Sequence, residues 1–361
     1  MSNAPNLSRR AVLAGGGLAA SASLAAPAIA QGAVRWRMVT SWPENLPGPG
    51  VTAQRLTDRV RALSDGRFEI ELYPAGSLVP ALEVFDAVRD GVAEAAHTAS
   101  FFWQGKIRAS VFFTAMPFGL TTPEHQAWIV QGGGQEIWDE LYAPFGLKPF
   151  MAGNTGMQMG GWYKFALTGA DDLKGLKIRM PGIGGEIVRR LGAVPTSLPP
   201  GEIFSALESG LIDAAEFLGP WSDQAQGFWQ VAPVYHWPGF HEPNGTGELI
   251  VARDALDALP GDLRVILNHA AAAENAFAVA ESDWFNAVSL RQLVDEHQVK
   301  LAPFPRDVLT LARAATPDVL DEIAAEDTGF ARALASYRAA INVLRPWSDV
   351  GVKGYLAARA G

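Results

Sequence analysis

Charged side chains lie near the carboxyl ends of two predicted β-strands, where they could recognise a small anion. Arg179 ends an apolar strand predicted at residues 176–180, and Glu216 closes another predicted at 212–218. Ligands of open α/β sheets bind outside the carboxyl ends of strands. A guanidinium there matches a carboxylate bidentately, although Arg179 could instead pair with a structural acid. Glu216 in a cleft would need a counter-charge, either Arg179 or a cation.

Two amides and a second acid extend this candidate site. Asn154 and Gln158 lie in a glycine-rich stretch at 153–162, where the backbone can approach a ligand closely and the amides could hydrogen-bond it. A tight domain-crossing turn with its own Asx hydrogen bonds is the alternative. Glu242 follows an aromatic stretch at 237–240. Glu216, Glu242 and the amide oxygen of Gln158 form an all-oxygen set suited to Na⁺ or Ca²⁺, which spacing alone does not establish.

The aromatic run Phe101-Phe102-Trp103 could supply an apolar wall. Most aromatic residues of the chain should belong to the core, but we expect Phe102 and Trp103 to contact a small ligand. Enzyme motifs are missing: the sequence has no H-E-x-x-H, no G-x-S-x-G and no P-loop. Only His236 and His241 lie near each other, and their separation fits no common zinc pattern. We therefore interpret the single histidines as packing or surface residues and predict a protein that is not an enzyme.

The first thirty residues have the features of an export signal. Arg9 and Arg10 form a twin arginine, an apolar run follows, and Ala28-Ile29-Ala30 offers a small-residue cleavage site. This pattern predicts a Tat-type signal peptide removed near Ala30 and a periplasmic mature chain. The chain of 361 residues has no cysteine, which excludes disulfide scaffolds and Cys-ligated zinc or iron–sulfur sites, and its net charge is −9. An acidic chain without a basic tract is a poor nucleic-acid binder.

Strand and helix patterns alternate along most of the mature chain and indicate α/β units. Strands are predicted at 34–39, 68–72 and 93–98, with helices at 53–63 and 82–88. The rhythm repeats over 154–242, with helices at 186–191 and 203–207. From 263 to 297 there is neither Gly nor Pro, which predicts a helix on the order of 50 Å long that spans both domains. Residues 305–344 should be helical with breaks at Pro317 and Gly329.

The segments 172–182 and 202–214 resemble hallmark segments of the extracytoplasmic receptors of TRAP transporters, the DctP-like family. The segments 154–162 and 75–80 and the strand end at Glu216 are similar to the subgroup that binds 2-oxo acids such as pyruvate and its lactate-binding relatives. The resemblance covers essentially the whole mature chain. It departs at Phe217, where the pyruvate binder has tryptophan, and at 101–103, which replace a tyrosine-rich stretch.

The resemblance implies an α/β, two-lobed periplasmic binding protein-like fold, each lobe a mixed sheet flanked by helices. We expect lobe I at 31–153, completed by about 244–262, and lobe II at 154–243. The spanning helix would occupy 263–297, and a C-terminal strand and helices 298–361, where some members of the family dimerise. Two lobes joined by several crossings make a hinge with a ligand cleft.

The resemblance also implies the roles of the candidate residues. Arg179 would clamp the substrate carboxylate and Asn154 would add a hydrogen bond. Na⁺ or Ca²⁺ would bridge the substrate to Gln158, Glu216, the backbone carbonyl of Phe217, and Glu242. The expected ligand is a small 2-oxo- or 2-hydroxy-monocarboxylate, delivered to the membrane subunits of a TRAP transporter.

Alternatives to this interpretation remain open from the sequence. The receptor could bind a C4-dicarboxylate or a sugar acid. An exported metal-dependent enzyme acting on a hydroxy acid, or a sensor partner of a membrane kinase, would use the same cleft.

Overall fold

The computed structural model describes Met1 and residues 33–360, and the chain divides into two compact units at Ala33/Val34. The predicted signal peptide, with Arg9, Arg10 and the cleavage site near Ala30, lies outside the described residues. The remaining description concerns the second unit. None of its helices is long and apolar enough to cross a membrane, among the residues described.

The first sheet has five strands in the order β2-β1-β3-β10-β4. Strand β1 lies between β2 and β3 and is parallel to both, whereas β10 is antiparallel to β3 and to β4. The predicted strands at 34–39, 68–72 and 93–98 are confirmed within one or two residues. The strand bounds are β1 Val34–Thr40, β2 Phe68–Tyr73, β3 Ala95–Thr98, β4 Leu147–Asn154 and β10 Thr246–Ala252.

Helices cover this sheet because their apolar residues recur three and four apart. In α1 (Pro49–Leu63), Ala53, Leu56 and Val60 are buried. A capping box fixes the start of α3 (Thr122–Gln131), where Glu124 accepts from the backbone N–H of Thr121 at 2.9 Å. The others are α2 Val84–Arg89, α4 Gly134–Tyr142 and the short 3₁₀ helices η1 Ser100–Trp103, η2 Arg108–Phe113 and η3 Ala143–Phe145.

The second sheet has six strands in the order β11-β9-β5-β8-β6-β7 and is also mixed, since β5 is antiparallel to both β8 and β9. The strand predicted at 212–218 is shorter than expected, because only Ala214–Ala215 pairs in β8 before the chain leaves the sheet toward α7. Its strands are β5 Gly161–Tyr163, β6 Lys177–Arg179, β7 Val194–Thr196, β8 Ala214–Ala215, β9 Val234–Trp237 and β11 Lys300–Pro303. Its helices are η4 Ala170–Leu173, α5 Gly182–Arg190, η5 Pro200–Glu202, α6 Ile203–Ser209, α7 Pro220–Ala225 and η6 Phe228–Gln230.

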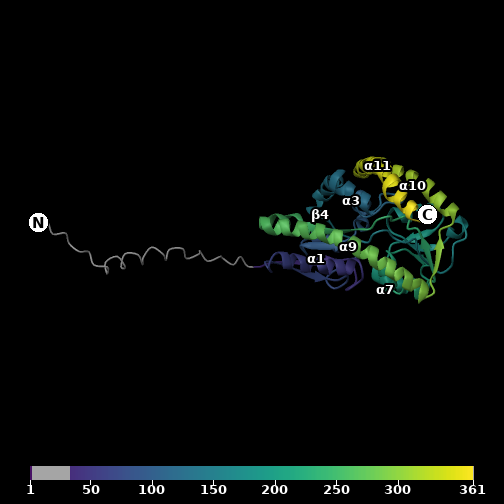
Figure 1. Cartoon of the computed structure of the whole chain (residues 1–361), viewed down its shortest axis with the longest axis horizontal. Helices are drawn as coiled ribbons and strands as arrows, with labels where there is room; N and C mark the ends of the chain where they lie inside the picture. Colours follow the sequence, from purple (N-terminus) through teal and green to yellow (C-terminus); the bar gives the residue numbers. More distant parts are fainter. Residues whose placement is uncertain (2–32, 361) are drawn as a thin grey trace. The chain divides into compact units, whose positions relative to one another are not determined.

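One long helix, α9 (Gly261–Asp295), follows the short α8 (Arg253–Ala258) and contacts elements on both sides of the molecule (Figure 1). It packs on α1 and β4 beside the first sheet and on α7 beside the second. The predicted spanning helix is therefore confirmed as one unbroken element of 35 residues.

The C-terminal part consists of α10 (Arg306–Glu326), α11 (Thr328–Ser348), a π-turn at Asp349–Lys353 and α12 (Gly354–Ala360). The predicted break at Pro317 is wrong, because this proline lies inside α10 on an exposed face. The carbonyl that its ring leaves without a donor, that of Arg313, belongs to an exposed residue and can bond water. The second break falls at Asp327, which caps α11 by accepting from the N–H of Phe330 at 2.7 Å.

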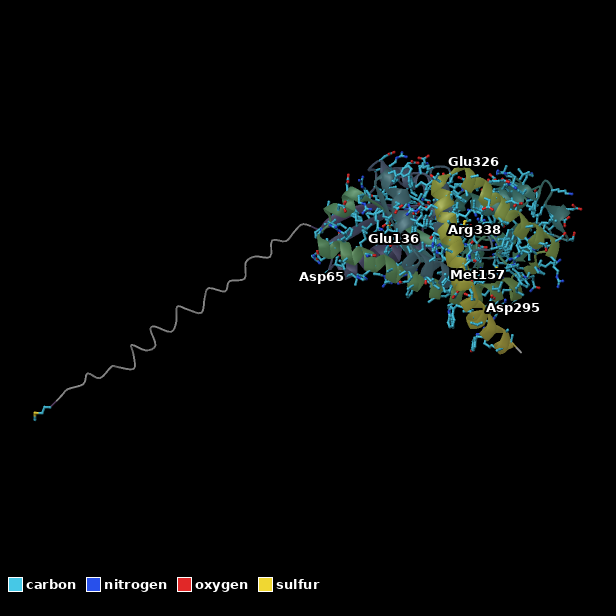
Figure 2. All side chains as sticks on the ribbon, turned by 90° about the horizontal axis from the view of Figure 1, so that it is seen from above. Asp65, Glu136, Met157, Asp295, Glu326 and Arg338 are labelled. Carbon is cyan, nitrogen blue, oxygen red and sulfur yellow. The ribbon has the colours of Figure 1, made fainter. Side chains whose placement is uncertain are left out.

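Helices α10 and α11 lie side by side and carry charged outer faces. Arg338 of α11, labelled in Figure 2, pairs with Asp321 of α10 at 2.7 Å. Beyond this pair, the last turns of α11 and the helix α12 expose several large apolar side chains.

Candidate functional site

A small cavity of about 30 Å³ lies where the ends of strands from both sheets meet. His97 and Asn154 reach it from the carboxyl ends of β3 and β4, and Thr246 from the start of the antiparallel β10. Arg179 reaches it from the carboxyl end of β6 in the second sheet. This is the edge at which ligands of open α/β sheets bind, and the volume favours a small molecule.

Arg179 is 2 % exposed and pairs with Glu216, whose side chain is equally buried. Its Nη1 donates to the carboxylate of Glu216 and, at 2.8 Å, to the backbone carbonyl of the same residue. Its Nε donates to the carbonyl of Leu198 at 3.4 Å. Nη2 donates to no acceptor in the described part of the chain. One end of the planar guanidinium is therefore available to a carboxylate in the cavity.

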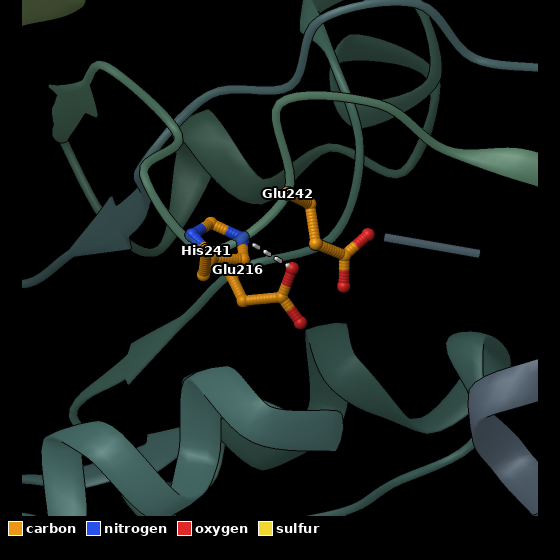
Figure 3. A group of neighbouring side chains, drawn as sticks. All are labelled: Glu216, His241 and Glu242. Carbon is orange, nitrogen blue, oxygen red and sulfur yellow. Dashed lines mark hydrogen bonds and ion pairs between the residues drawn. The ribbon is translucent and has the colours of Figure 1, made fainter. Parts of the chain in front are cut away.

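Glu216, His241 and Glu242 form a buried group whose potential ligand atoms all lie within 4.8 Å of one another (Figure 3). His241 Nε2 lies 3.0 Å from Glu216 Oε2. Burial, together with the charge of Glu216, raises the pKa of Glu242 well above its usual value, and Arg179 and Gln158 oppose this rise. Two carboxylates this close and this buried require a cation or a proton between them.

Gln158 brings an amide oxygen to the same place. Its Nε2 donates to Thr155 Oγ1 at 3.1 Å, whereas its Oε1 is fully buried without a hydrogen-bond partner. A Cβ at Gly245 would lie 2.5 Å from that Nε2, so only glycine leaves room for the amide. No described residue donates to the carbonyl oxygen of Phe217. The donor set thus fits a hard cation, since an orphaned amide oxygen and two carboxylates are what such an ion binds.

Asn154 lines the cavity, but both of its amide hydrogens are engaged. Nδ2 donates to Asn244 Oδ1 at 2.9 Å and to Thr246 Oγ1 at 3.1 Å, and Oδ1 accepts from the N–H of Gly156 at 2.9 Å. Its backbone carbonyl accepts from Ser282 of α9 at 3.1 Å. Asn154 therefore ties together the chain crossings at 154–161 and 237–246 and the long helix.

The two predicted wall residues separate in the structure. Phe102 lines the cavity together with Phe101. Trp103 does not reach it; its indole N–H points the other way, into the core, and donates to Glu248 at 3.1 Å. The structure therefore brings together Arg179, Gln158, Glu216, Phe217 and Glu242 with Asn154 and Phe102 beside them, and leaves Trp103 apart.

Sequence reasoning missed residues of two kinds at this site. His241, interpreted from the sequence as a packing or surface residue, does not line the cavity but contacts Glu216, and its position next to Glu242 was a usable signal. Trp42 and His97 follow β1 and end β3, at the same sheet edge as Asn154. Trp42 Nε1 donates to His97 Nδ1 at 2.9 Å, and burial lowers the pKa of His97 to about 4, so this imidazole is neutral.

Similarity to known proteins covers most of the chain. The monocarboxylate 2-oxoacid-binding periplasmic protein of Nostoc sp. is 38% identical over 322 residues, 89% of this chain and 88% of the relative. A TRAP periplasmic solute binding protein from Pseudoalteromonas atlantica with bound sodium and pyruvate is 38% identical, with a TM-score of 0.88 over 90% of this chain and 99% of that one. A TRAP transporter solute binding protein from Bordetella bronchiseptica, a mixed occupancy dimer with calcium and picolinate, is 36% identical, with a TM-score of 0.88 over 91% and 100%.

These similarities agree with the fold and with the resemblance found in the sequence. The model of bacterial extracellular solute-binding protein, family 7, matches residues 38–327. The chain therefore belongs to the bacterial extracellular solute-binding proteins of family 7.

Proposed function

We propose that the chain is the receptor of a TRAP transporter and binds a small 2-oxo- or 2-hydroxy-monocarboxylate together with Na⁺ or Ca²⁺. The observation that carries this proposal is the pairing, in one small cavity, of a free guanidinium edge on Arg179 with the orphaned oxygen of Gln158 beside Glu242. A carboxylate needs the first and a cation the second.

The ligands of the similar structures share one chemistry. Pyruvate has a carboxylate next to a carbonyl oxygen, and picolinate has one next to a ring nitrogen. Each can therefore give a cation two donor atoms from adjacent carbons while its carboxylate faces a cationic side chain. In this chain Arg179 would hold the carboxylate, and Gln158, Glu216, the carbonyl of Phe217 and Glu242 would hold the cation.

The other residues would shape and orient the site. Phe102, with Phe101, would form the apolar wall. Asn154 would act mainly by fixing the chain crossings, since its amide hydrogens are already used. His241 would orient Glu216 through the contact at 3.0 Å. No bond of the ligand is made or broken in this role, which is ligand capture.

We propose that lobe I comprises residues 31–153 and 244–262 and lobe II residues 154–243, with the cavity between them. Membership of the two sheets supports this division, since β1 to β4 and β10 share one sheet and β5 to β9 the other. The C-terminal strand β11 adds to the second sheet beside β9. Closure of the lobes on the ligand would create the form that docks the membrane subunits.

Export by the Tat pathway, with cleavage near Ala30 and release into the periplasm, completes the proposal. It rests on the sequence pattern at 1–30 and agrees with a family of extracellular solute-binding proteins.

The function is tested by mass spectrometry of ligand released from purified protein, by metal analysis of the same sample, and by calorimetric titration with pyruvate and lactate. A 2-oxo or 2-hydroxy acid with one cation supports the proposal. A dicarboxylate or sugar acid without metal would overturn the ion assignment of Gln158, Glu216 and Glu242. Release of a chemically altered ligand would indicate an enzyme instead.

A homodimer through the C-terminal helices is the second part of the proposed assembly. Val343, Trp347, Val350 and Tyr355 are 65% to 74% exposed along α11, the π-turn and α12. An apolar face of this kind is costly in water and suits a second copy of the chain. A Trp347→Glu variant should sediment as a monomer at concentrations where the unmodified protein is dimeric. An unmodified protein that stays monomeric would refute the dimer.

A further inference from the structure

The aromatic wall of the cavity stands on a weak backbone element. Phe101 and Phe102 belong to η1, a 3₁₀ turn of four residues, and both side chains are half-buried. The turn is closed by hydrogen bonds of 3.2 Å from Phe102 N to Ala99 O and from Gln104 N to Phe101 O. Short 3₁₀ turns have poor hydrogen-bond geometry, so side-chain anchors must fix where such a wall stands.

The two end residues of this turn, Ser100 and Trp103, lie near one buried acid, Glu248. Trp103, the last residue of η1, donates its indole N–H to Glu248 Oε2 at 3.1 Å. Ser100, the first residue, has a fully buried hydroxyl without a hydrogen-bond partner, and the pKa of Glu248 is sensitive to it. The turn that holds the wall therefore begins and ends beside the same carboxyl group.

The second helix layer supplies further donors around Glu248. Trp138 and Tyr142 of α4 have a buried indole N–H and a buried hydroxyl without hydrogen-bond partners, and both also act on the pKa of Glu248. The carboxyl lies on β10, opposite Thr98 of β3. It forms no ion pair with any described cation. Glu248 thus sits between the sheet, α4 and η1, surrounded by donors of which none is charged.

We propose that Glu248 is a positioning residue that fixes the Phe101–Phe102 wall through its hydrogen bond with Trp103 and so sets the size of ligand that the cavity accepts. The inference rests on the proposed function, because it concerns the selectivity of that site. Glu248 touches neither ligand nor ion and acts through the turn.

The energetics argue for a role beyond packing. A buried carboxyl without a cationic partner destabilises a fold unless donors surround it. Burial raises the pKa of Glu248 to about 7, because the charged form of the carboxyl is destabilised in this position. An apolar residue at this position, near Trp103 and Phe85, whose tilted rings have centres 5.3 Å apart, would avoid that cost. What the carboxyl provides and an apolar residue cannot is a directional hydrogen bond to Trp103, the last residue of η1.

The test compares Glu248→Leu with Glu274→Leu, because leucine, unlike glutamine, has no atom that accepts the indole N–H of Trp103. Glu274 is also a fully buried acid of this chain, but it pairs with Arg55 and Arg59 between α1 and α9 and does not line the cavity. Affinities for pyruvate and for the bulkier 2-oxo-4-methylpentanoate are measured by calorimetry at saturating Ca²⁺, and thermal unfolding of each protein is recorded alongside.

In Glu248→Leu the preference for pyruvate over the bulkier acid should fall by about tenfold, equal to about 1.4 kcal/mol. In Glu274→Leu the preference should stay as in the unmodified protein while the unfolding temperature drops. A folded Glu248→Leu protein with unchanged preference would overturn the inference. Should that variant not fold, Trp103→Phe decides by the same criterion, because it removes the tie and keeps an aromatic ring. If the unmodified protein binds neither acid, the proposed function fails and the inference falls with it.

Discussion

Replacing Arg179 with methionine tests the centre of the proposed site. The substitution keeps much of the side-chain length and removes three observed interactions: the pair with Glu216, the bond to its carbonyl at 2.8 Å, and the bond to Leu198 at 3.4 Å. It also removes the free Nη2 edge. The ligand carboxylate would then enter a cavity lined by Glu242, with Glu216 beside that residue, and no Lys or Arg of the described residues would pair with either acid.

The expected size of the effect follows from the burial of the pair. Removing one partner of a buried, hydrogen-bonded charge pair costs about 3 to 5 kcal/mol. If the ligand carboxylate is that partner in the complex, the dissociation constant should rise at least about 100-fold, since about 1.4 kcal/mol corresponds to tenfold. Calorimetric titration with pyruvate at fixed Ca²⁺ measures it directly.

Arg55→Met is the matched control. Arg55 also binds buried acid, donating to Glu274 at 2.7 Å, but it joins α1 to α9 away from the cavity. It should lower the unfolding temperature and leave pyruvate affinity unchanged. If Arg179→Met binds pyruvate within about threefold of the unmodified protein, Arg179 is a structural partner of Glu216 and the clamp is refuted.

Three further predictions concern the ion and the buried acids. Gln158→Ala should weaken Ca²⁺ binding by about tenfold in a cation titration, since one oxygen ligand is lost, and unchanged cation affinity would remove Gln158 from the ion site. The pKa of Glu248 is raised from 4.5 to about 7 by burial, so the folded protein holds a proton that the unfolded chain releases in this range. The stability that this proton confers is lost as pH rises from about 4.5 to about 7, by up to about 1.4 kcal/mol per pH unit. Buried histidines with pKa lowered to about 4 act in the opposite direction. The measured quantity is therefore the difference in urea unfolding free energy between the unmodified protein and Glu248→Gln, and a difference that does not vary with pH would contradict the assignment. Finally, Glu242→Gln should weaken Ca²⁺ binding more than Na⁺ binding.

The sequence predicted secondary structure well where one physical signal dominated. The run without Gly or Pro gave a single helix, α9, and the alternation at 68–72 gave β2. The break predicted at Pro317 was wrong because a proline on the solvent-exposed face of a helix leaves a carbonyl that can bond water. The sequence does not show which face of a helix is exposed. The short β8 was overestimated since apolar residues after Ala215 continue the pattern while leaving the sheet.

For the candidate site, residue type and position at a strand end predicted which residues lie near the cavity. The sequence did not predict the direction in which each side chain points. From the sequence, Arg179 was one of two possible counter-charges for Glu216, the other being a cation, and the two side chains pair. Trp103 and Phe102 are adjacent in sequence, yet one faces the core and the other the cavity, which depends on the local 3₁₀ turn. Asn154 was predicted as a ligand donor, whereas its amide hydrogens are used by residues about ninety positions away. The sequence does not show such long-range hydrogen-bond partners, because they depend on how the segments 154–161 and 237–246 pack together.

The expected preference of Glu242→Gln follows from the charges of the site. Arg179 and Glu216 form an ion pair whose charges cancel, so an ionised Glu242 and a monocarboxylate ligand leave two negative charges. Ca²⁺ balances both, whereas Na⁺ leaves one, which a proton on Glu242 would remove. The raised pKa of Glu242 supports such a proton, and sodium and calcium each occur with a monocarboxylate in similar structures. Glutamine at 242 leaves one negative charge, which Na⁺ balances and Ca²⁺ exceeds. Cation titrations at saturating pyruvate should therefore show a loss of Ca²⁺ affinity at least about tenfold larger than the loss of Na⁺ affinity. Equal losses for the two ions would mean that Glu242 serves as an oxygen ligand without setting the charge of the site.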